Sequence, residues 1–155
     1  MSISKEQWKT IEAELKGGWV QMKFKLHGHE IDITRCRKSE STTVLGVYID
    51  GVMKSDWFKE LKDIDASDEF MSKVVKQVCF HKFKAMYNKK QLEEIAKYKR
   101  RSGAKRMKEV FGDAPEKAGW TYLVPYFGSS ALLIRQFKKI EGLELVSELK
   151  EVGVL

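Results

Sequence analysis

The sequence predicts an α+β protein, in which an N-terminal helix lies on a three-stranded antiparallel meander and a mainly helical C-terminal half follows. Two changes of period lead to this prediction. Apolar residues recur at helical spacing over residues 4–15, then alternate with polar residues from 20 to 50. After Gly51 the helical spacing returns. We expect a single domain over residues 1–155, with the helix and meander in 1–51 and a helical basic part in 52–155.

The first helix is predicted from its cap and its apolar stripe. Ser4 and Gln7 have the spacing of a capping box, in which each side chain bonds the backbone N–H of the other residue. The apolar positions that follow on one helical face are Trp8, Ile11 and Leu15. Gly17 and Gly18 end the helix.

In the next three stretches apolar and polar residues alternate, as they do in strands with one solvent-exposed face: WVQMKFKLHG, HEIDITRCR and TVLGVYIDG. Short turns at Gly28 and at residues 38–42 separate them, and Asp50-Gly51 closes the last one. Connections this short join antiparallel neighbours. We therefore expect a meander whose apolar face is covered by the first helix.

The remaining elements are predicted mainly from caps and glycines. A short helix over residues 55–64 is capped by Ser55, and a longer one begins near Ser67 or Asp68. The stretch CFHKFKAMY fits neither period. The longest helical pattern opens at Asn88 and closes at Gly112, with a break expected at Ser102-Gly103. A short aromatic strand or loop follows, then a helix that is capped by Ser129 or Ser130 and ends at Gly142, and residues 143–146 add a last strand.

Positive charge is concentrated in one part of the chain. The net charge is +7, but residues 71–110 hold 13 of the 29 Lys and Arg residues and only 3 of the 22 acidic ones. This segment is therefore +10, and the rest of the chain is −3. Such an asymmetry creates a local field that attracts polyanions.

Residues 97–108 contain seven Lys or Arg and no acidic residue, whereas an ordinary surface helix mixes signs to form i,i+4 pairs. We predict a surface that binds nucleic-acid phosphates. Tyr87 lies among these charges and, with Tyr98, is placed to stack on bases. The alternatives left open are a solvated helix face and a site for an acidic protein patch. The predicted nucleic-acid-binding residues are Lys82, Lys84, Lys89, Lys90, Lys97, Tyr98, Lys99, Arg100, Arg101, Lys105, Arg106 and Lys108.

Other chemistry has weaker support in the sequence. His27 and His29 flank a turn, and Cys79 with His81 forms a C-x-H pair, but neither has the usual spacing of a zinc site. No P-loop, G-x-G-x-x-G, H-E-x-x-H or nucleophile elbow is present. We therefore predict neither a metal, a cofactor nor an enzymatic activity. The aromatic stretch 120–127 is either core or an exposed interface.

The sequence also bears on location. There is no apolar run of about 18 residues, so no membrane span is expected. The N-terminal stretch MSISKEQWKT lacks the apolar segment of a signal peptide, and two cysteines are too few for a disulfide framework. We expect a cytoplasmic protein; its oligomeric state is left open.

Three stretches carry a family resemblance: SKEQWKTIEAEL, VYIDGVMKSDW and YLVPYFGSSALLIRQFKKIEGLELV. Through them the chain resembles a family of small proteins encoded by tailed phages and prophages, in which the segment matching 71–110 is also basic. The resemblance implies a phage or prophage accessory protein that acts in the host cytoplasm, and it assigns no functional residues. Together with the charge, it favours a binding protein that engages DNA, RNA or a host nucleic-acid–protein complex. The alternative is a host-directed inhibitor, such as an anti-defence protein, that binds a protein partner.

Overall fold

The computed structural model describes residues 3–147, which form two compact units. The first, here the sheet unit, comprises residues 3–81 and 123–147, and the second, here the basic unit, comprises residues 82–122. The boundaries between the two units lie at 81/82 and 122/123. Residues on both sides of position 51 contribute to the core of the sheet unit.

Helix α1 (Lys5–Leu15) has the predicted capping box. The backbone N–H of Gln7 donates to Ser4 Oγ at 3.1 Å, and the backbone N–H of Ser4 donates to Gln7 Oε1 at 2.8 Å. The cap fixes where the helix begins and so which residues face inward. Those buried are the three predicted ones, Trp8, Ile11 and Leu15.

The predicted antiparallel meander is confirmed as β1 (Gln21–Leu26), β2 (His29–Arg37) and β3 (Thr43–Ile49). Two short strands extend it, β6 (Tyr126–Phe127) beside β3 and β7 (Glu144–Leu145) beside β1, in the order β6-β3-β2-β1-β7. The last strand expected at 143–146 is therefore present. Ile33 pairs with Met22 on one side and Val47 on the other, so the apolar faces of the three long strands align.

Two tight turns, the one that joins β1 to β2 and the one that follows β3, need left-handed backbone. His27 and Gly28 have φ of 49° and 82°, and Asp50 and Gly51 have φ of 52° and 82°. Two consecutive positive φ values are typical of the tight turn that matches the twist of antiparallel strands, and glycine adopts them without steric cost.

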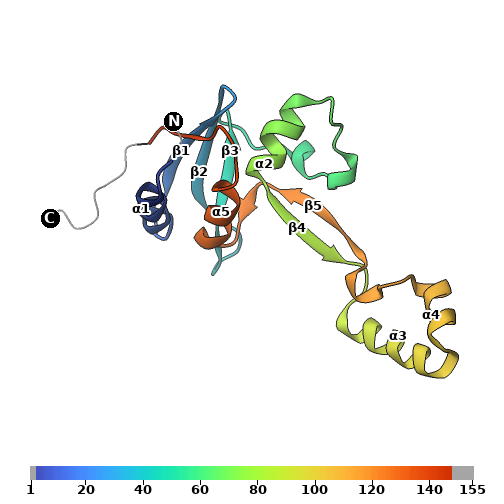
Figure 1. The fold of residues 1–155 in the computed structure, drawn as a ribbon. Helices are drawn as coiled ribbons and strands as arrows, with labels where there is room; N and C mark the ends of the chain where they lie inside the picture. The colour runs from blue at the N-terminus through green and yellow to red at the C-terminus, as the bar shows by residue number, and fades with distance from the viewer. Residues whose placement is uncertain (1–2, 148–155) are drawn as a thin grey trace. The chain divides into compact units, whose positions relative to one another are not determined.

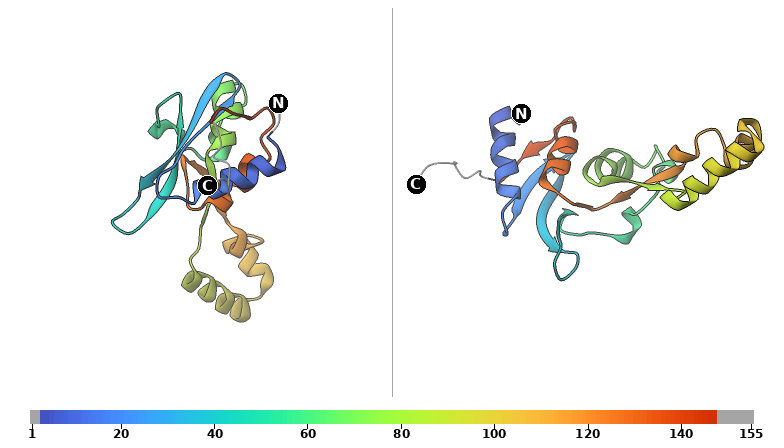
Figure 2. Two further views of the ribbon diagram at one scale, coloured as in Figure 1. Left: turned by 90° about the vertical axis from the view of Figure 1, so that its left-hand side faces the viewer. Right: turned by 90° about the horizontal axis from the view of Figure 1, so that it is seen from below.

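Helices α1 and α5 (Ser130–Phe137) lie next to each other on one face of the sheet (Figures 1 and 2). Phe24 of β1 connects them, since its ring stacks on Trp8 at 6.2 Å and meets Phe137 edge-on at 5.4 Å. Phe127 of β6 contacts Phe137 at 5.8 Å and Phe80 at 5.4 Å. An aromatic chain therefore runs through the core.

The predicted helix over residues 55–64 is wrong. Two single 3₁₀ turns occur instead, η1 (Ser55–Trp57) and η2 (Leu61–Asp63), and the capping position before η1 is held by Lys54 rather than by Ser55. Lys59, between the turns, accepts a hydrogen bond at its carbonyl from the backbone N–H of Leu123 at 2.9 Å. This long-range backbone pairing replaces the bond that a continuous helix would make.

The helix predicted from Ser67 or Asp68 is present over residues 69–78. Asp68 Oδ1 accepts from the backbone N–H of Met71 at 3.1 Å, as expected of a residue that starts a helix. The middle of the helix, η3 (Met71–Val75), is π-helical and leads into α2 (Lys76–Val78). The residues that it buries are Met71, Val74, Val75 and Val78.

Helix α5 is capped by Ser129, whose Oγ accepts from the backbone N–H of Leu132 at 3.3 Å. The predicted end at Gly142 is wrong, because the helix ends at Phe137. The earlier end allows Ile140 and Leu143, which are 9% and 5% exposed, to join the core before the chain enters β7.

The stretch CFHKFKAMY, which fits neither period, contains β4 (Phe80–Ala85). This strand forms a two-stranded sheet with β5 (Gly119–Val124). Between them come α3 (Lys89–Ser102), α4 (Ala104–Phe111) and a 3₁₀ turn, η4 (Pro115–Lys117). The predicted start at Asn88, break at Gly103 and end at Gly112 are confirmed.

The residues of the aromatic stretch 120–127 differ in their exposure to solvent. Phe127 and Pro125 are buried in the sheet unit, whereas Trp120 of the basic unit is 36% exposed. Within residues 3–147, no helix has both the length and the apolar character that a membrane crossing requires.

Candidate nucleic-acid interface

The basic unit contains the protein's entire excess of positive charge. It holds 12 of the 29 Lys and Arg residues and 5 of the 22 Asp and Glu residues. The rest of the chain therefore has 17 of each sign. The formal charge of the basic unit is +7, the same as that of the whole protein.

The cap of α3 sets which of its residues face outward. The backbone N–H of Gln91 donates to Asn88 Oδ1, and that of Asn88 donates to Gln91 Oε1, both at 2.8 Å. With the helix started there, Ile95 is the residue of α3 that is buried. Lys90, Lys97 and Arg101 are spaced by seven and four residues, so they lie along one helical face.

Gly103 separates α3 from α4. Its φ of 90° and ψ of 159° suit glycine and not residues with a side chain. The two helices meet at this break (Figure 1) and pack on each other, with Met107 of α4 buried. No side chain caps α4, whose first backbone N–H groups add partial positive charge next to Lys105 and Arg106.

Three aromatic rings complete the small core of the basic unit. Tyr98 contacts Phe111 edge-on, with ring centroids 5.4 Å apart, and Tyr87 contacts Phe111 in the same way at 6.2 Å. All three rings are half-buried. The two tyrosines that the sequence placed among the charges thus also hold α4 against α3.

All twelve predicted binding residues lie in the basic unit. Two are on β4, seven on α3 and three on α4, and all are exposed except Lys82 and Tyr98, which are half-buried. Lys97 lies 3.5 Å from Glu94, and Lys108 lies 3.6 Å from Asp113. Among the described residues, none of the other nine predicted cations has a carboxylate within 4 Å. Both pairs are more than half exposed and contribute little, so the positive field is largely uncompensated.

Two residues of this surface, Trp120 and Lys117, are not among the predicted binding residues. Lys84 Nζ lies 5.7 Å from the centroid of the Trp120 ring, across the two-stranded sheet. Lys117, in the turn before β5, adds another exposed cation. The missed signal was the alternation in FHKFKA and GWTYLV, which would have predicted two strands if the two stretches had been considered as a pair.

An open hollow of about 460 Å³ lies beside α3. Its apolar lining includes Tyr87, Tyr98 and Phe111. Its charged lining residues are Lys90, Glu94 and Arg101. The hollow combines exposed ring surface with an excess of positive charge.

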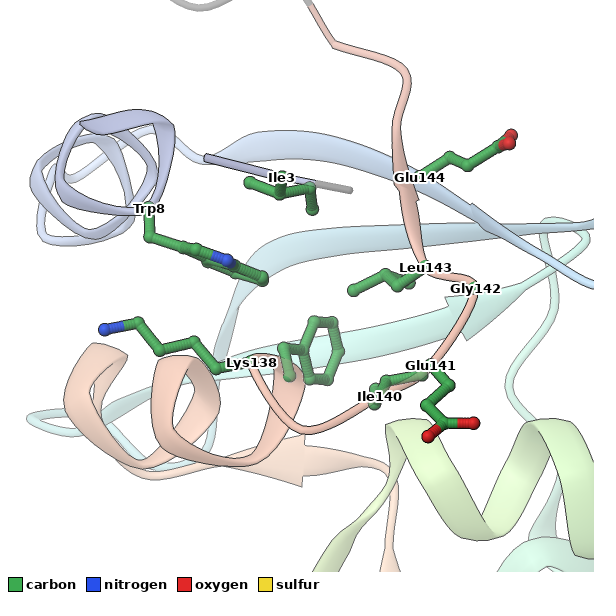
Figure 3. Close-up of a pocket in the computed structure, with 9 residues that line it drawn as sticks. Ile3, Trp8, Lys138, Ile140, Glu141, Gly142, Leu143 and Glu144 are labelled. Carbon is green, nitrogen blue, oxygen red and sulfur yellow. The ribbon is translucent and has the colours of Figure 1, made fainter. Parts of the chain in front are cut away.

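The sheet unit has a different cavity, of about 330 Å³, between α1 and the segment that follows α5. Figure 3 shows Trp8 and Leu143 pointing into it, whereas the carboxylates of Glu141 and Glu144 point away from the Trp8 ring. The cavity therefore brings aliphatic and aromatic groups together without converging acids.

Two of the histidines singled out in the sequence, His29 and His81, have other partners, and the thiol of Cys79 is buried. His29 Nδ1 lies 2.6 Å from Asp50 Oδ2, and His81 Nε2 lies 2.7 Å from the carbonyl oxygen of Lys76. Burial raises the pKa of Cys79 to about 12, so its nucleophilic thiolate is scarce near neutral pH. Within residues 3–147, no group of three or more His, Cys, Asp and Glu side chains is arranged to hold a metal ion.

In comparisons with known proteins, no family model, no curated protein and no solved structure matches the chain.

Proposed function

We propose that the basic unit is a non-enzymatic nucleic-acid-binding module of a phage or prophage accessory protein. It engages DNA or RNA, alone or within a host nucleic-acid–protein complex in the host cytoplasm. The observation that carries this proposal is the +7 charge of residues 82–122, against no net charge in the rest of the chain. A nucleic-acid backbone is a dense polyanion, and each phosphate neutralised by Lys or Arg releases condensed counterions.

The placement of the charges supports this function. Exposed cations lie on both sides of the break between α3 and α4, and the two helices pack on each other, so several phosphates are within reach of one surface. Their ammonium and guanidinium groups are mostly free of carboxylate partners in the described residues. Binding therefore does not require that many internal ion pairs be broken.

The test is binding of labelled random-sequence DNA and RNA, followed by fluorescence anisotropy between about 50 and 200 mM salt. The variant replaces four exposed cations that do not line the hollow: Lys99→Gln, Arg100→Gln, Lys105→Gln and Arg106→Gln. We expect an affinity loss of at least about ten-fold and a smaller salt slope, since each lost phosphate contact removes about 0.7 to 0.9 from the slope.

A matched control removes the same charge from the sheet unit through Lys9→Gln, Lys54→Gln, Lys138→Gln and Lys139→Gln, all exposed positions. It should keep the affinity within about two-fold, because long-range charge effects are weak at these salt concentrations. Thermal unfolding of both variants checks the fold. If the unaltered protein binds neither polymer at about 50 mM salt, the proposal fails.

A second candidate function is binding of a host protein, as a host-directed inhibitor such as an anti-defence protein would do. Phe83, Met86 and Val110 of the basic unit are 52%, 52% and 58% exposed, and exposed apolar side chains are suited to protein contacts. Capture from host lysate with and without nuclease separates the two functions. A partner that is retained after nuclease, kept by the four-glutamine variant and lost with Met86→Ser and Val110→Ser would favour the protein partner.

A further inference from the structure

We infer that the hollow beside α3 accommodates an unpaired base, so that the basic unit prefers single-stranded nucleic acid to duplex. This inference rests on the proposed function and names the kind of nucleic acid that it binds.

The walls of the hollow provide aromatic surface. Tyr87 and Tyr98 each meet Phe111 nearly perpendicularly, at 79° and 81°. In such a contact the edge of one ring meets a face of the other, so ring faces remain that neither partner covers. The volume of about 460 Å³ is within the range of small-molecule sites, which is about 300–1,000 Å³. A flat heterocycle can therefore lie against these rings.

The charges beside the rings match a nucleotide. Lys90 and Arg101 line the same hollow as the tyrosines, and both are exposed. The third charged residue of the lining, Glu94, already pairs with Lys97 at 3.5 Å. When a base stacks on an aromatic ring, its flanking phosphates remain on the strand on either side of it, where cations attract them. An apolar side chain of a protein partner would gain nothing from these two cations.

The shape of the site selects unpaired bases. In a duplex, the faces of the bases are covered by their neighbours, and a protein reaches only the phosphates and the groove edges. A hollow walled by rings can take a base face only when the base is unstacked. The cations of α3 and α4 attract both forms of nucleic acid, whereas the rings add affinity only for the single strand.

The experiment uses the full chain and compares a labelled 20-nucleotide single strand with a duplex of the same sequence, by anisotropy at about 50 mM salt. The unaltered protein should bind the single strand more tightly. Tyr98→Leu removes the ring but keeps apolar volume, and it should weaken single-strand binding by about five-fold or more and duplex binding by less than about two-fold. Tyr98→Phe keeps the ring and should bind like the unaltered protein.

Because Tyr98 also packs on Phe111, its replacement can disturb the fold of the basic unit. A second measurement is therefore needed that requires no substitution. Photo-cross-linking of the unaltered protein to a single strand that carries 5-iodouracil supplies it. The cross-linked peptide should contain Tyr87, Tyr98 or Phe111. Cross-links found only outside these residues would overturn the inference.

The outcomes separate the two proposals. Equal affinity for single strand and duplex, with equal losses in Tyr98→Leu, overturns the base-binding inference and leaves the proposed function in place. The same holds if Tyr98→Leu alters neither affinity, as expected if the hollow receives a protein side chain. Failure of the unaltered protein to bind any nucleic acid contradicts the proposed function itself.

Discussion

In the sheet unit, two helices and a five-stranded sheet share a continuous core that includes the fully buried rings of Phe24, Phe127 and Phe137. In the basic unit, α3 and α4 each bury one apolar residue, Ile95 and Met107, beside half-buried aromatic rings. Charge follows the opposite trend, since the first unit is balanced and the second is +7. The region with the smaller core therefore also bears the greater internal repulsion.

This contrast has a thermodynamic consequence. Like charges four residues apart on a helix, such as Lys97 and Arg101, destabilise it by roughly 0.2–0.5 kcal/mol per pair. A polyanion that neutralises them removes this repulsion, so ligand binding and the stability of the basic unit are coupled. The concentration of like charge on which the proposed function depends thus lowers the stability of the basic unit.

The largest expected effect is in the core of the sheet unit. Phe24→Ala removes a ring that contacts both Trp8 and Phe137 and is 0% exposed. We expect a loss of about 3–5 kcal/mol in the free energy of unfolding, measured by guanidinium titration. As a control, Trp19→Ala removes a side chain that is 87% exposed and should change this free energy by less than about 0.5 kcal/mol. Similar losses in both variants would refute the assignment of the core.

The corresponding change in the basic unit should be smaller and local. Ile95→Ala deletes the residue that α3 buries, and about 2 kcal/mol is expected, at the low end for an Ile→Ala change, because the surrounding rings are half-exposed and can close the gap. Hydrogen exchange should accelerate in α3 and α4 while β1–β3 keep their protection. Equal loss of protection in the meander would show that the two units unfold together.

The predictions that succeeded from sequence depend on neighbours along the chain. The capping box of Ser4 and Gln7, the alternation of the meander strands and the break at Gly103 are all local signals. The helix predicted over 55–64 failed because the carbonyl of Lys59 bonds the backbone N–H of Leu123, which is 64 residues away and which no local pattern reveals.

In the candidate site, too, the features that depend on local sequence could be predicted and those that depend on long-range contacts could not. The basic residues could be found by counting charges, which needs no structure. The hollow could not be found in this way, because it exists only once α4 folds against α3 and brings Phe111 to Tyr98. Trp120 was likewise linked to Lys84 only by the pairing of β4 with β5.

A substitution at the break between α3 and α4 should lower stability by an intermediate amount. An added Cβ at Gly103 would meet no atom within 4 Å, so Gly103→Ala tests backbone conformation without a clash. The φ of 90° and ψ of 159° should cost Ala about 1–3 kcal/mol. We expect faster hydrogen exchange in α4 and a weaker preference for single strands, because Phe111 is no longer held against Tyr98. Ser102→Ala, one residue earlier, is the control and should leave both quantities unchanged.

The smallest expected change in stability concerns a turn of the sheet unit. There the carboxylate of Asp50 is held by hydrogen bonds, whereas the like charges of the basic unit repel one another. The carboxylate of Asp50 accepts hydrogen bonds from His29 Nδ1 at 2.6 Å and from the backbone N–H of Glu30 at 2.9 Å, and these bonds hold its pKa below the ordinary value. A lowered pKa means that the ionised form favours the folded state. Its contribution is complete above the unfolded pKa of about 3.9 and is lost as the pH falls through the folded pKa.

Asp50→Asn removes the charge and keeps the turn, because Asn tolerates the positive φ of 52°. The side chain is 50% exposed, so we expect a loss of at most about 1 kcal/mol near pH 6. The gap in melting temperature between the two proteins should begin to shrink once the pH falls below about 4, where the carboxyl group of the unfolded chain is protonated, and should close as the pH falls through the lower pKa of the folded state. A gap that stays constant down to pH 2 would mean that the loss comes from altered hydrogen-bond geometry and not from the carboxylate charge.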